Sequence, residues 1–236
     1  MELAVRSWGE GPRTAVLVHG YTDDSSTWWR VGPALAARGW RVLAPDLRGH
    51  GSSPRAASYA LQDFADDLVE TLPAGVHLAL GHSLGAAVLG AAVERLQPKQ
   101  AVFVDPPWLR RNPRDLLLAP LASTADELPP HTAIWSVEDV ATDLRSNAQV
   151  DPAVGLALVS TLTAGPVPAP VPPRPGTRVL VPELDPVLPV EAHPELERLG
   201  YVIATQPGVR HVMHRDAPDA FFALLLSHLD EDELVA

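Results

Sequence analysis

The chain of 236 residues contains no cysteine, which excludes disulfides, thiolate catalysis and cysteine-ligated metal centres. Basic residues are scarce, because 18 Lys and Arg stand against 29 Asp and Glu, for a formal net charge of −11. This charge repels phosphate groups, and no cluster of Lys and Arg creates a local exception. We therefore expect neither nucleic acid nor a membrane surface as a partner.

Long hydrophobic runs are also missing. No apolar run approaches the roughly 20 residues of a membrane span, and the first residues, Met1 to Arg6, lack the basic segment and apolar block of a secretory signal. We expect a cytoplasmic protein. With 46% hydrophobic residues, a chain of this length can bury one sizeable core. No pattern indicates the oligomeric state.

Short apolar runs that favour strands alternate with helical patterns along the chain. The strands are expected near 14–18, 41–44, 76–80, 101–104, 178–181 and 201–204, and the helices near 25–38, 60–72, 84–96, 190–199 and 217–229. The strands are continuously apolar, as in residues 101–104, which is typical of a parallel sheet covered on both faces. The pattern predicts an α/β fold with a mostly parallel central sheet and helices on both faces.

One connection is too long for an ordinary loop. About 70 residues separate Val104 from Arg178, whereas a connection in an α/β unit takes about 2 to 6. The segment holds 13 of the 25 prolines and two helical patterns, at 137–148 and 152–162. Its proline-rich end, 165–176, predicts a stiff return to the core. These features indicate an insertion.

The most informative motif is Gly-x-Ser-x-Gly at Gly81, Ser83 and Gly85, between an apolar run and a helical pattern. A strand that bends sharply into a helix pushes one residue out of the sheet, and side chains at the two glycines would collide with the neighbouring strand and helix. Ser83 is therefore the candidate nucleophile. Small residues at 86, 87 and 90–92 would allow the helix to lie close to the sheet.

Two earlier strands also end in loops with a recognisable pattern, His19-Gly20-Tyr21 and Asp46-Leu47-Arg48-Gly49-His50-Gly51-Ser52-Ser53. Together with the motif at Ser83, and in this order, they resemble the α/β-hydrolase superfamily. The resemblance spans most of the chain and is weakest over 106–176. It implies a core formed by 1–105 and 177–236, with a lid or cap at 106–176 that shapes the substrate pocket.

In that superfamily a histidine follows the last strand and activates the serine. Here the loop after residue 204 contains His211 and His214. His211 is the preferred base, because it lies three residues after Gly208 and before a helix that Asp216 could cap. His214 is the alternative. The His-x-x-His spacing could also suggest a metal pair, but no adjacent glutamate or third ligand accompanies it, so we expect no metal.

The resemblance also implies an acid that orients the histidine. Asp185 is the preferred acid, because it follows the strand at 178–181 and precedes a proline and an apolar pair. Glu183 is a rival carboxylate, at a position where the family usually has a glycine. Asp105, at the end of the preceding strand, is the second rival, since some members place their acid there.

The mechanism needs donors for the oxygen that becomes negative. By resemblance these are the backbone N–H groups of Tyr21 and Leu84, the latter at a helix N-terminus. Tyr21, Trp108 and Trp135 are candidate substrate contacts. Four other residues are expected to shape or support the loops rather than to react: His19, Gly20, His50 and His82. Asp23 and Asp24 most simply cap the helix that follows them.

The resulting hypothesis is a serine hydrolase that acts on a small-molecule substrate without a cofactor. Ser83 would attack an ester, lactone or thioester and form an acyl-enzyme, with His211 as base and Asp185 as its partner. A lyase, a C–C bond hydrolase or a cofactor-free oxidative enzyme could use the same three residues. A non-catalytic ligand-binding homologue is the further alternative. Epoxide hydrolases and haloalkane dehalogenases are disfavoured, because their elbow carries aspartate where this chain has Ser83.

Overall fold

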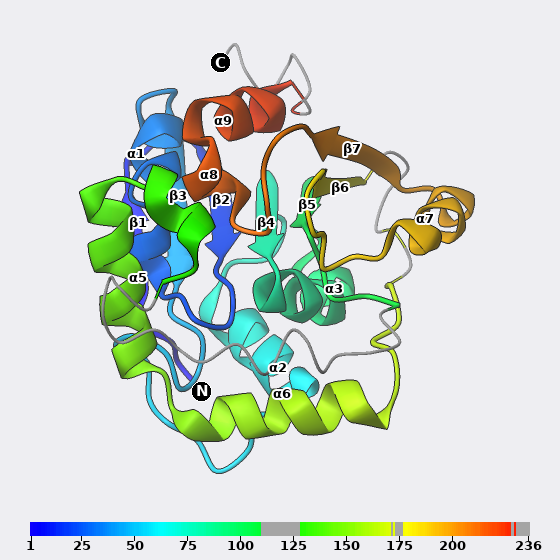
Figure 1. Cartoon of the computed structure of the whole chain (residues 1–236). Coiled ribbons are helices and arrows are strands. Elements are labelled where there is room, and N and C mark those ends of the chain that lie inside the picture. The colour runs from blue at the N-terminus through cyan, green and yellow to red at the C-terminus, as the bar shows by residue number, and fades with distance from the viewer. Residues whose placement is uncertain (110–127, 171, 173–176, 228, 230–236) are drawn as a thin grey trace.

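The computed structural model describes residues 1–109, 128–170, 172, 177–227 and 229 (Figure 1). Seven strands form one sheet: β1 (Val5–Trp8), β2 (Arg13–Val18), β3 (Trp40–Pro45), β4 (Leu78–His82), β5 (Gln100–Val104), β6 (Arg178–Pro182) and β7 (Val202–Gln206). The strand order is β1-β3-β2-β4-β5-β6-β7. β1 pairs with β3 in the antiparallel sense, and every other pairing is parallel. The mostly parallel sheet is confirmed.

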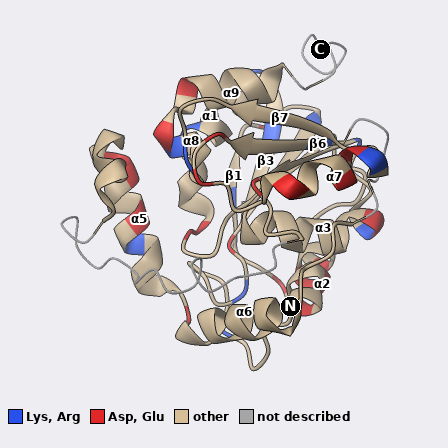
Figure 2. Ribbon diagram, turned by 45° about the vertical axis from the view of Figure 1, so that its right-hand side comes forward, with Lys and Arg blue, Asp and Glu red and all other residues tan. Residues whose placement is uncertain are grey.

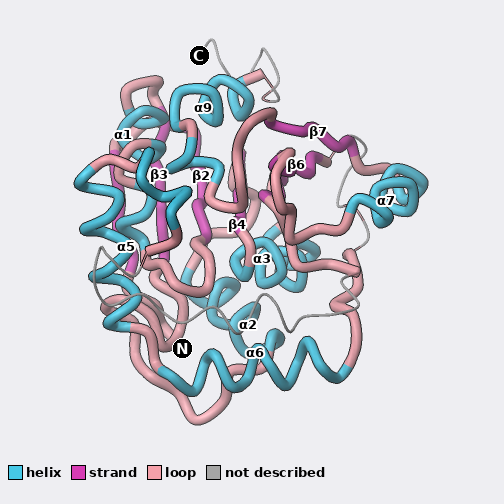
Figure 3. The backbone as a smooth tube through the Cα atoms, in the orientation of Figure 1, coloured by secondary structure: helices cyan, strands magenta, loops and turns pink. Residues whose placement is uncertain are grey.

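The helices and 3-10 turns surround this sheet (Figure 3). They are η1 (Ser25–Trp28), α1 (Val31–Ala36), α2 (Leu61–Thr71), α3 (Leu84–Leu96), η3 (Pro130–Ile134), α5 (Val137–Gln149), α6 (Pro152–Ala164), η4 (Val190–Ala192), α7 (His193–Leu199), α8 (Met213–Asp216) and α9 (Pro218–Leu226). None of the described helices is long and apolar enough to cross a bilayer.

Two separate hydrophobic clusters cover the two faces of the sheet. One cluster gathers side chains of α2 and α3, including Phe64 and Val88, against sheet residues such as Phe103. The other gathers side chains of η1, α1 and α9, including Trp28 and Phe221. Because both faces are covered, the inner strands carry apolar residues at successive positions, as the sequence pattern predicted.

The long insertion between β5 and β6 contributes α5 and α6, two helices that run along different sides of the molecule (Figure 1). Both helices match the patterns expected at 137–148 and 152–162, and each begins at a cap. The Ser136 side chain accepts the Asp139 N–H in a capping box, and the Asp151 side chain accepts the Ala153 N–H. Residues 110–127 of the expected lid, and 171 and 173–176 of its proline-rich return, lie outside the described residues.

Candidate active site

Ser83 lies at the junction of β4 and α3 and has positive φ, with φ 53° and ψ −117°. A Cβ on Gly81 would lie 2.5 Å from the carbonyl oxygen of Gly85, and a Cβ on Gly85 would lie 2.4 Å from the carbonyl oxygens of Val18 and His19. No side chain fits at either position, which is the crowding that the motif predicted. The turn therefore places Ser83 at the carboxyl edge of the sheet, where it is only 8% exposed and lines a cavity.

His211 lies in the loop between β7 and α8, and its imidazole meets a carboxylate from another strand end. Nδ1 of His211 lies 2.6 Å from Oδ2 of Asp105, which is fully buried at the end of β5. An ionised carboxylate only accepts hydrogen bonds, so Nδ1 carries the proton and donates it. In the neutral ring this leaves Nε2 with a lone pair, which is the protonation state that a general base requires.

The Asp105 carboxylate is held by two backbone donors as well as by His211. The N–H groups of Val187 and Leu188 donate to its two oxygens, each at 2.9 Å. Its own backbone adopts a left-handed conformation at φ 41°, and its N–H donates to the Leu180 carbonyl oxygen. The loop after β6, which was expected to supply the acid, instead supplies N–H donors to Asp105.

The structure does not bring Asp185 to His211, so the preference for Asp185 as the acid is corrected. The Asp185 side chain is 78% exposed and pairs with the Arg210 guanidinium. Glu183 is also directed elsewhere, because its carboxylate accepts the Gly208 N–H at 2.8 Å. Of the three carboxylates considered, the one that contacts the imidazole is Asp105. Both strand ends lie at the same edge of the sheet, and only the conformation of the loop after β6 separates them.

His214, the alternative base, faces away from this pair. Its imidazole is buried against the Trp28 ring at 4.7 Å, and its Nε2 lies 2.8 Å from the Thr27 hydroxyl. Burial lowers the pKa of His214 well below 6.5, and the electrostatic effect of His82 lowers it further. Across the described residues, no group of three His, Asp or Glu side chains could hold a metal ion. The two histidines of the His-x-x-His pattern thus have different partners.

A cavity of about 210 Å³ opens beside Ser83 and His211. Its wall includes Tyr21 and Leu84, whose N–H groups were predicted to face the reacting oxygen. Among the described residues, neither N–H has a hydrogen-bond acceptor. Apolar side chains form most of the remaining wall, from α2, α3, α6 and two loops: Leu61, Phe64, Ala87, Pro107, Leu158, Leu162 and Val167. These residues could not be identified as cavity lining from the sequence, because hydrophobic periodicity indicates only that a residue is buried.

Neither tryptophan that was considered a substrate contact lines this cavity. Trp108 is 1% exposed and packs against Phe103 and Tyr201, with ring centroids 4.7 and 5.6 Å away. Trp135 donates its indole N–H to Asp216 at 2.7 Å and lies over the Arg215 guanidinium. Both expectations are corrected, because each indole fills a gap between the insertion and the core. Tyr21 does line the cavity.

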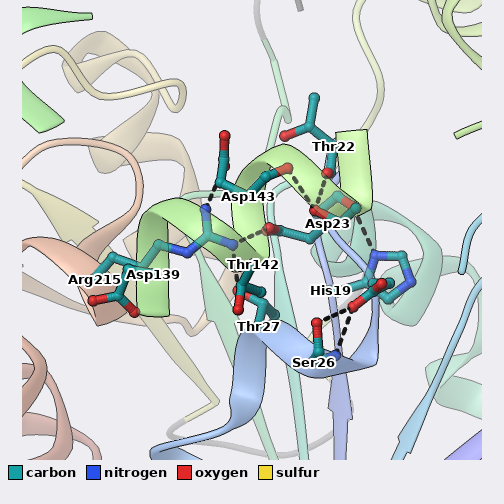
Figure 4. A network of polar contacts seen from close by, with 12 residues as sticks. His19, Thr22, Asp23, Ser26, Thr27, Asp139, Thr142, Asp143 and Arg215 are labelled. Atoms are coloured by element: carbon teal, nitrogen blue, oxygen red, sulfur yellow. Dashed lines mark hydrogen bonds and ion pairs between the residues drawn. The ribbon is translucent and has the colours of Figure 1, made fainter. Parts of the chain in front are cut away.

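A buried ionic cluster forms the polar end of the cavity, and Figure 4 shows it from close by. The Arg215 guanidinium, from α8, donates to Asp23 and Asp143 at 2.5 Å each and to the Thr27 hydroxyl at 3.1 Å. Burial would raise the pKa of Asp23, but Arg215 and neighbouring histidines lower it to about 2. Burial raises the pKa of Asp143, partly offset by Arg215.

Two of the expected helix caps are not formed. Asp24 does cap η1, since its carboxylate accepts the Ser26 N–H at 2.7 Å, but Asp23 pairs with Arg215 instead. Asp216 caps no helix, because its carboxylate accepts the backbone N–H of Arg210 and the indole N–H of Trp135. No local sequence signal marks the contact between Asp23 and Arg215, since 192 positions separate the two residues.

Three further histidines contact the backbone of the loops around the site, as expected. His19 Nδ1 lies 2.8 Å from the Gly20 carbonyl oxygen, and its Nε2 accepts the Leu47 N–H. His50 Nε2 lies 2.7 Å from the Tyr21 carbonyl oxygen. His82 Nε2 lies 3.0 Å from the carbonyl oxygen of His211. All three side chains are buried.

Comparison with known proteins identifies the family. The model of the alpha/beta hydrolase family matches residues 15–224. The chain belongs to this family. The predicted superfamily and fold class are thereby confirmed.

The curated relatives are similar to only part of this chain. A pimeloyl-[acyl-carrier protein] methyl ester esterase of Aeromonas hydrophila is 36% identical over 118 residues, which cover 48% of this chain and 45% of that protein. A serine hydrolase-like protein of Dictyostelium discoideum is 31% identical over 96 residues, covering 37% of this chain and 27% of its own length. The chain thus matches less than half the length of these curated relatives.

Solved structures extend the likeness of the fold over nearly the whole chain. The crystal structure of a putative lipase from Acinetobacter baumannii superposes with a TM-score of 0.75 at 19% identity, covering 95% of this chain and 87% of that one. At this level of identity the likeness supports the fold alone.

Proposed function

We propose that this alpha/beta hydrolase family member is a serine hydrolase that cleaves small, uncharged esters, lactones or thioesters through an acyl-enzyme. The observation that carries the proposal is the contact of the buried Asp105 carboxylate with His211 Nδ1, beside the same cavity as the Ser83 elbow. A serine hydroxyl is a weak nucleophile and requires such an oriented base.

The proposed reaction has two halves. Nε2 of His211 takes the Ser83 proton as Oγ attacks the carbonyl carbon, and the N–H groups of Tyr21 and Leu84 donate to the oxyanion. His211 then gives the proton to the leaving alkoxide or thiolate, which departs as the C–O or C–S bond breaks. In the second half, Nε2 of His211 takes a proton from water as the water oxygen attacks the acyl carbon. The bond between that carbon and Ser83 Oγ then breaks, and His211 returns the proton to Oγ as the acid leaves.

The size and lining of the cavity favour a substrate with a small and largely apolar acyl group. A cavity of ~150 Å³ accommodates benzene, so about 210 Å³ suits an acyl chain of moderate length. The helix α6, which supplies Leu158, Thr161 and Leu162 to the wall, has no charged residue between Pro152 and Ala164 and is tan along its length in Figure 2. At the polar end, Asp23 and Asp143 already neutralise Arg215, which disfavours an anionic substrate.

Turnover of p-nitrophenyl acetate, butyrate and octanoate, together with lactone and thioester panels, tests the proposal. We expect hydrolysis of the neutral short esters and covalent labelling by a fluorophosphonate probe. Ser83→Ala should abolish both, whereas Ser160→Ala, on the exposed part of α6, should change neither. Labelling that persists in Ser83→Ala would rule out Ser83 as the nucleophile. Cleavage of a C–C bond substrate without ester turnover would favour the alternative chemistry.

A further inference from the structure

His82 occupies the position between the elbow glycine and the candidate nucleophile. Its side chain is 2% exposed, and its Nε2 lies 3.0 Å from the backbone carbonyl oxygen of His211. A carbonyl oxygen can only accept a hydrogen bond, so Nε2 carries a proton and donates it. This hydrogen bond joins the residue next to Ser83 directly to the backbone of the residue that carries the proposed base.

The His82 ring is confined on several sides. Its centroid lies 4.6 Å from that of His211 at an interplanar angle of 38°, and 5.2 Å from that of His214. A Cβ on Gly20 would lie 3.0 Å from His82 Nδ1, so a side chain at position 20 would press against the ring. Oδ2 of Asp23 lies 4.0 Å from Nδ1. The ring thus has little freedom to turn its Nε2 away from His211.

Burial also fixes the charge of His82, because it lowers the pKa of the imidazole to about 3, with a further contribution from His211. His82 is therefore neutral in the pH range in which a histidine base works. A cation at this position would oppose proton transfer to His211, whose ring is the nearest aromatic neighbour. The neutral ring provides a donor without adding charge.

We propose that His82 is a positioning residue for the reaction: its Nε2–H group holds the His211 backbone at the elbow, and thereby sets the imidazole of His211 against the Ser83 hydroxyl. The inference rests on the proposed function, because it gives His82, which also lines the cavity, the task of positioning the proposed base. A displacement of about 1 Å between nucleophile and base is enough to cost a large factor in rate.

Two substitutions separate the donor from the bulk of the ring. His82→Phe keeps an aromatic ring without an N–H, and His82→Gln places an amide donor near the position of Nε2. We expect kcat for p-nitrophenyl butyrate to fall at least tenfold in His82→Phe with KM changed less than twofold. His82→Gln should recover kcat to within about threefold of the wild type. His77→Phe, a control just before β4, should stay within twofold.

The result that overturns the inference is wild-type kcat in His82→Phe, or equal loss in the Phe and Gln variants when both melt well above the assay temperature. If the wild type neither turns over esters nor labels at Ser83, the proposed function fails instead. Nitrogen-15 NMR of the wild-type imidazoles decides the hydrogen bond independently of activity, with the His82 signals assigned by their loss in His82→Gln. A proton on Nε2 at pH 7 supports the contact, and a proton on Nδ1 alone refutes it.

Discussion

At the scale of single residues, the site depends on which carboxylate is kept away from water. Asp105 is fully buried and accepts two backbone N–H groups and one imidazole N–H, so its charge is compensated and its position is fixed. Asp185 is exposed and pairs with Arg210, an arrangement that is worth little in water. A base is oriented reliably only by the first kind of partner.

Substitution of the two aspartates distinguishes their roles. Asp105→Asn keeps the shape of the side chain but can no longer favour the Nδ1–H tautomer, so we expect kcat to fall by about 10² to 10⁴. Asp185→Asn, the matched control, should keep kcat within about twofold, since only a surface ion pair is lost. Steady-state kinetics with thermal melts measures both. A large loss in Asp185→Asn with an active Asp105→Asn would reverse the assignment.

The residues of the site were predictable to the extent that a local pattern fixes them. Ser83 and its two glycines are specified by the steric needs of one turn, and His211 by its place after the last strand. The carboxylate that contacts His211 could not be decided in this way, because Asp105 and Asp185 both follow strands that end at the same edge. The choice depends on the loop after β6, whose N–H groups turn toward Asp105.

At the scale of elements, the apolar runs located six of the seven strands, and α3 has the predicted bounds of Leu84–Leu96. β1 was missed because it is an antiparallel edge strand whose side chains are mostly exposed, so it lacks the continuous apolar signal. The helix expected over 25–38 is divided into η1 and α1, and the one over 217–229 is preceded by the short α8. Element type was predictable, and breaks within elements were not.

Helix α5 is joined to the core through buried charges rather than through an apolar face. Asp143 contacts Arg215, and Asp139 forms an ion pair with Arg30 at 2.7 Å and accepts the indole N–H of Trp29. The Ser146 hydroxyl donates to the Thr22 carbonyl oxygen. The contacts of α5 therefore lead to the segments that follow Tyr21 and His211, which places this helix in the support of the site.

Removal of Asp143 tests this docking. Asp143→Ala leaves Arg215 buried with one carboxylate, and we expect a loss of about 3 kcal/mol in unfolding free energy, together with faster amide hydrogen exchange in α5 than in α3. Glu138→Ala, on the exposed side of the same helix, is the control and should change stability by less than about 0.5 kcal/mol. Unchanged exchange in α5 after Asp143→Ala would show that other contacts hold the helix.

At the scale of the whole molecule, the fold encloses three imidazoles in their neutral form. Burial lowers the pKa of His50 to about 4, that of His82 to about 3 and that of His214 well below 6.5. In the unfolded chain each of them returns to about 6.5. Below that pH the unfolded state binds more protons than the folded state, so the stability that these residues contribute is present above pH 6.5 and is lost as the pH falls toward 4.

The carboxylates of the same region act in other parts of the pH range. Asp23, whose pKa is lowered to about 2, contributes stability above pH 3.8 that is lost only as the pH falls toward 2. Asp143, whose pKa is raised by burial, contributes in the opposite sense, because its stabilisation is complete below pH 3.8 and is lost as the pH rises through its folded value. Asp23 therefore adds no pH dependence between pH 6.5 and 5.5, where the three histidines become protonated in the unfolded chain.

We accordingly expect the protein to lose stability under mildly acidic conditions. Protonation of three histidines in the unfolded state at pH 5.5 lowers the free energy of unfolding by ~1.4 kcal/mol for each, or ~4 kcal/mol in total relative to pH 7.5. Urea unfolding across this range measures the slope, and His214→Gln should reduce it by about one third. His131→Gln, an exposed control, should leave it unchanged. A free energy of unfolding that is constant from pH 7.5 to 5.5 would mean that these imidazoles are not held neutral by the fold.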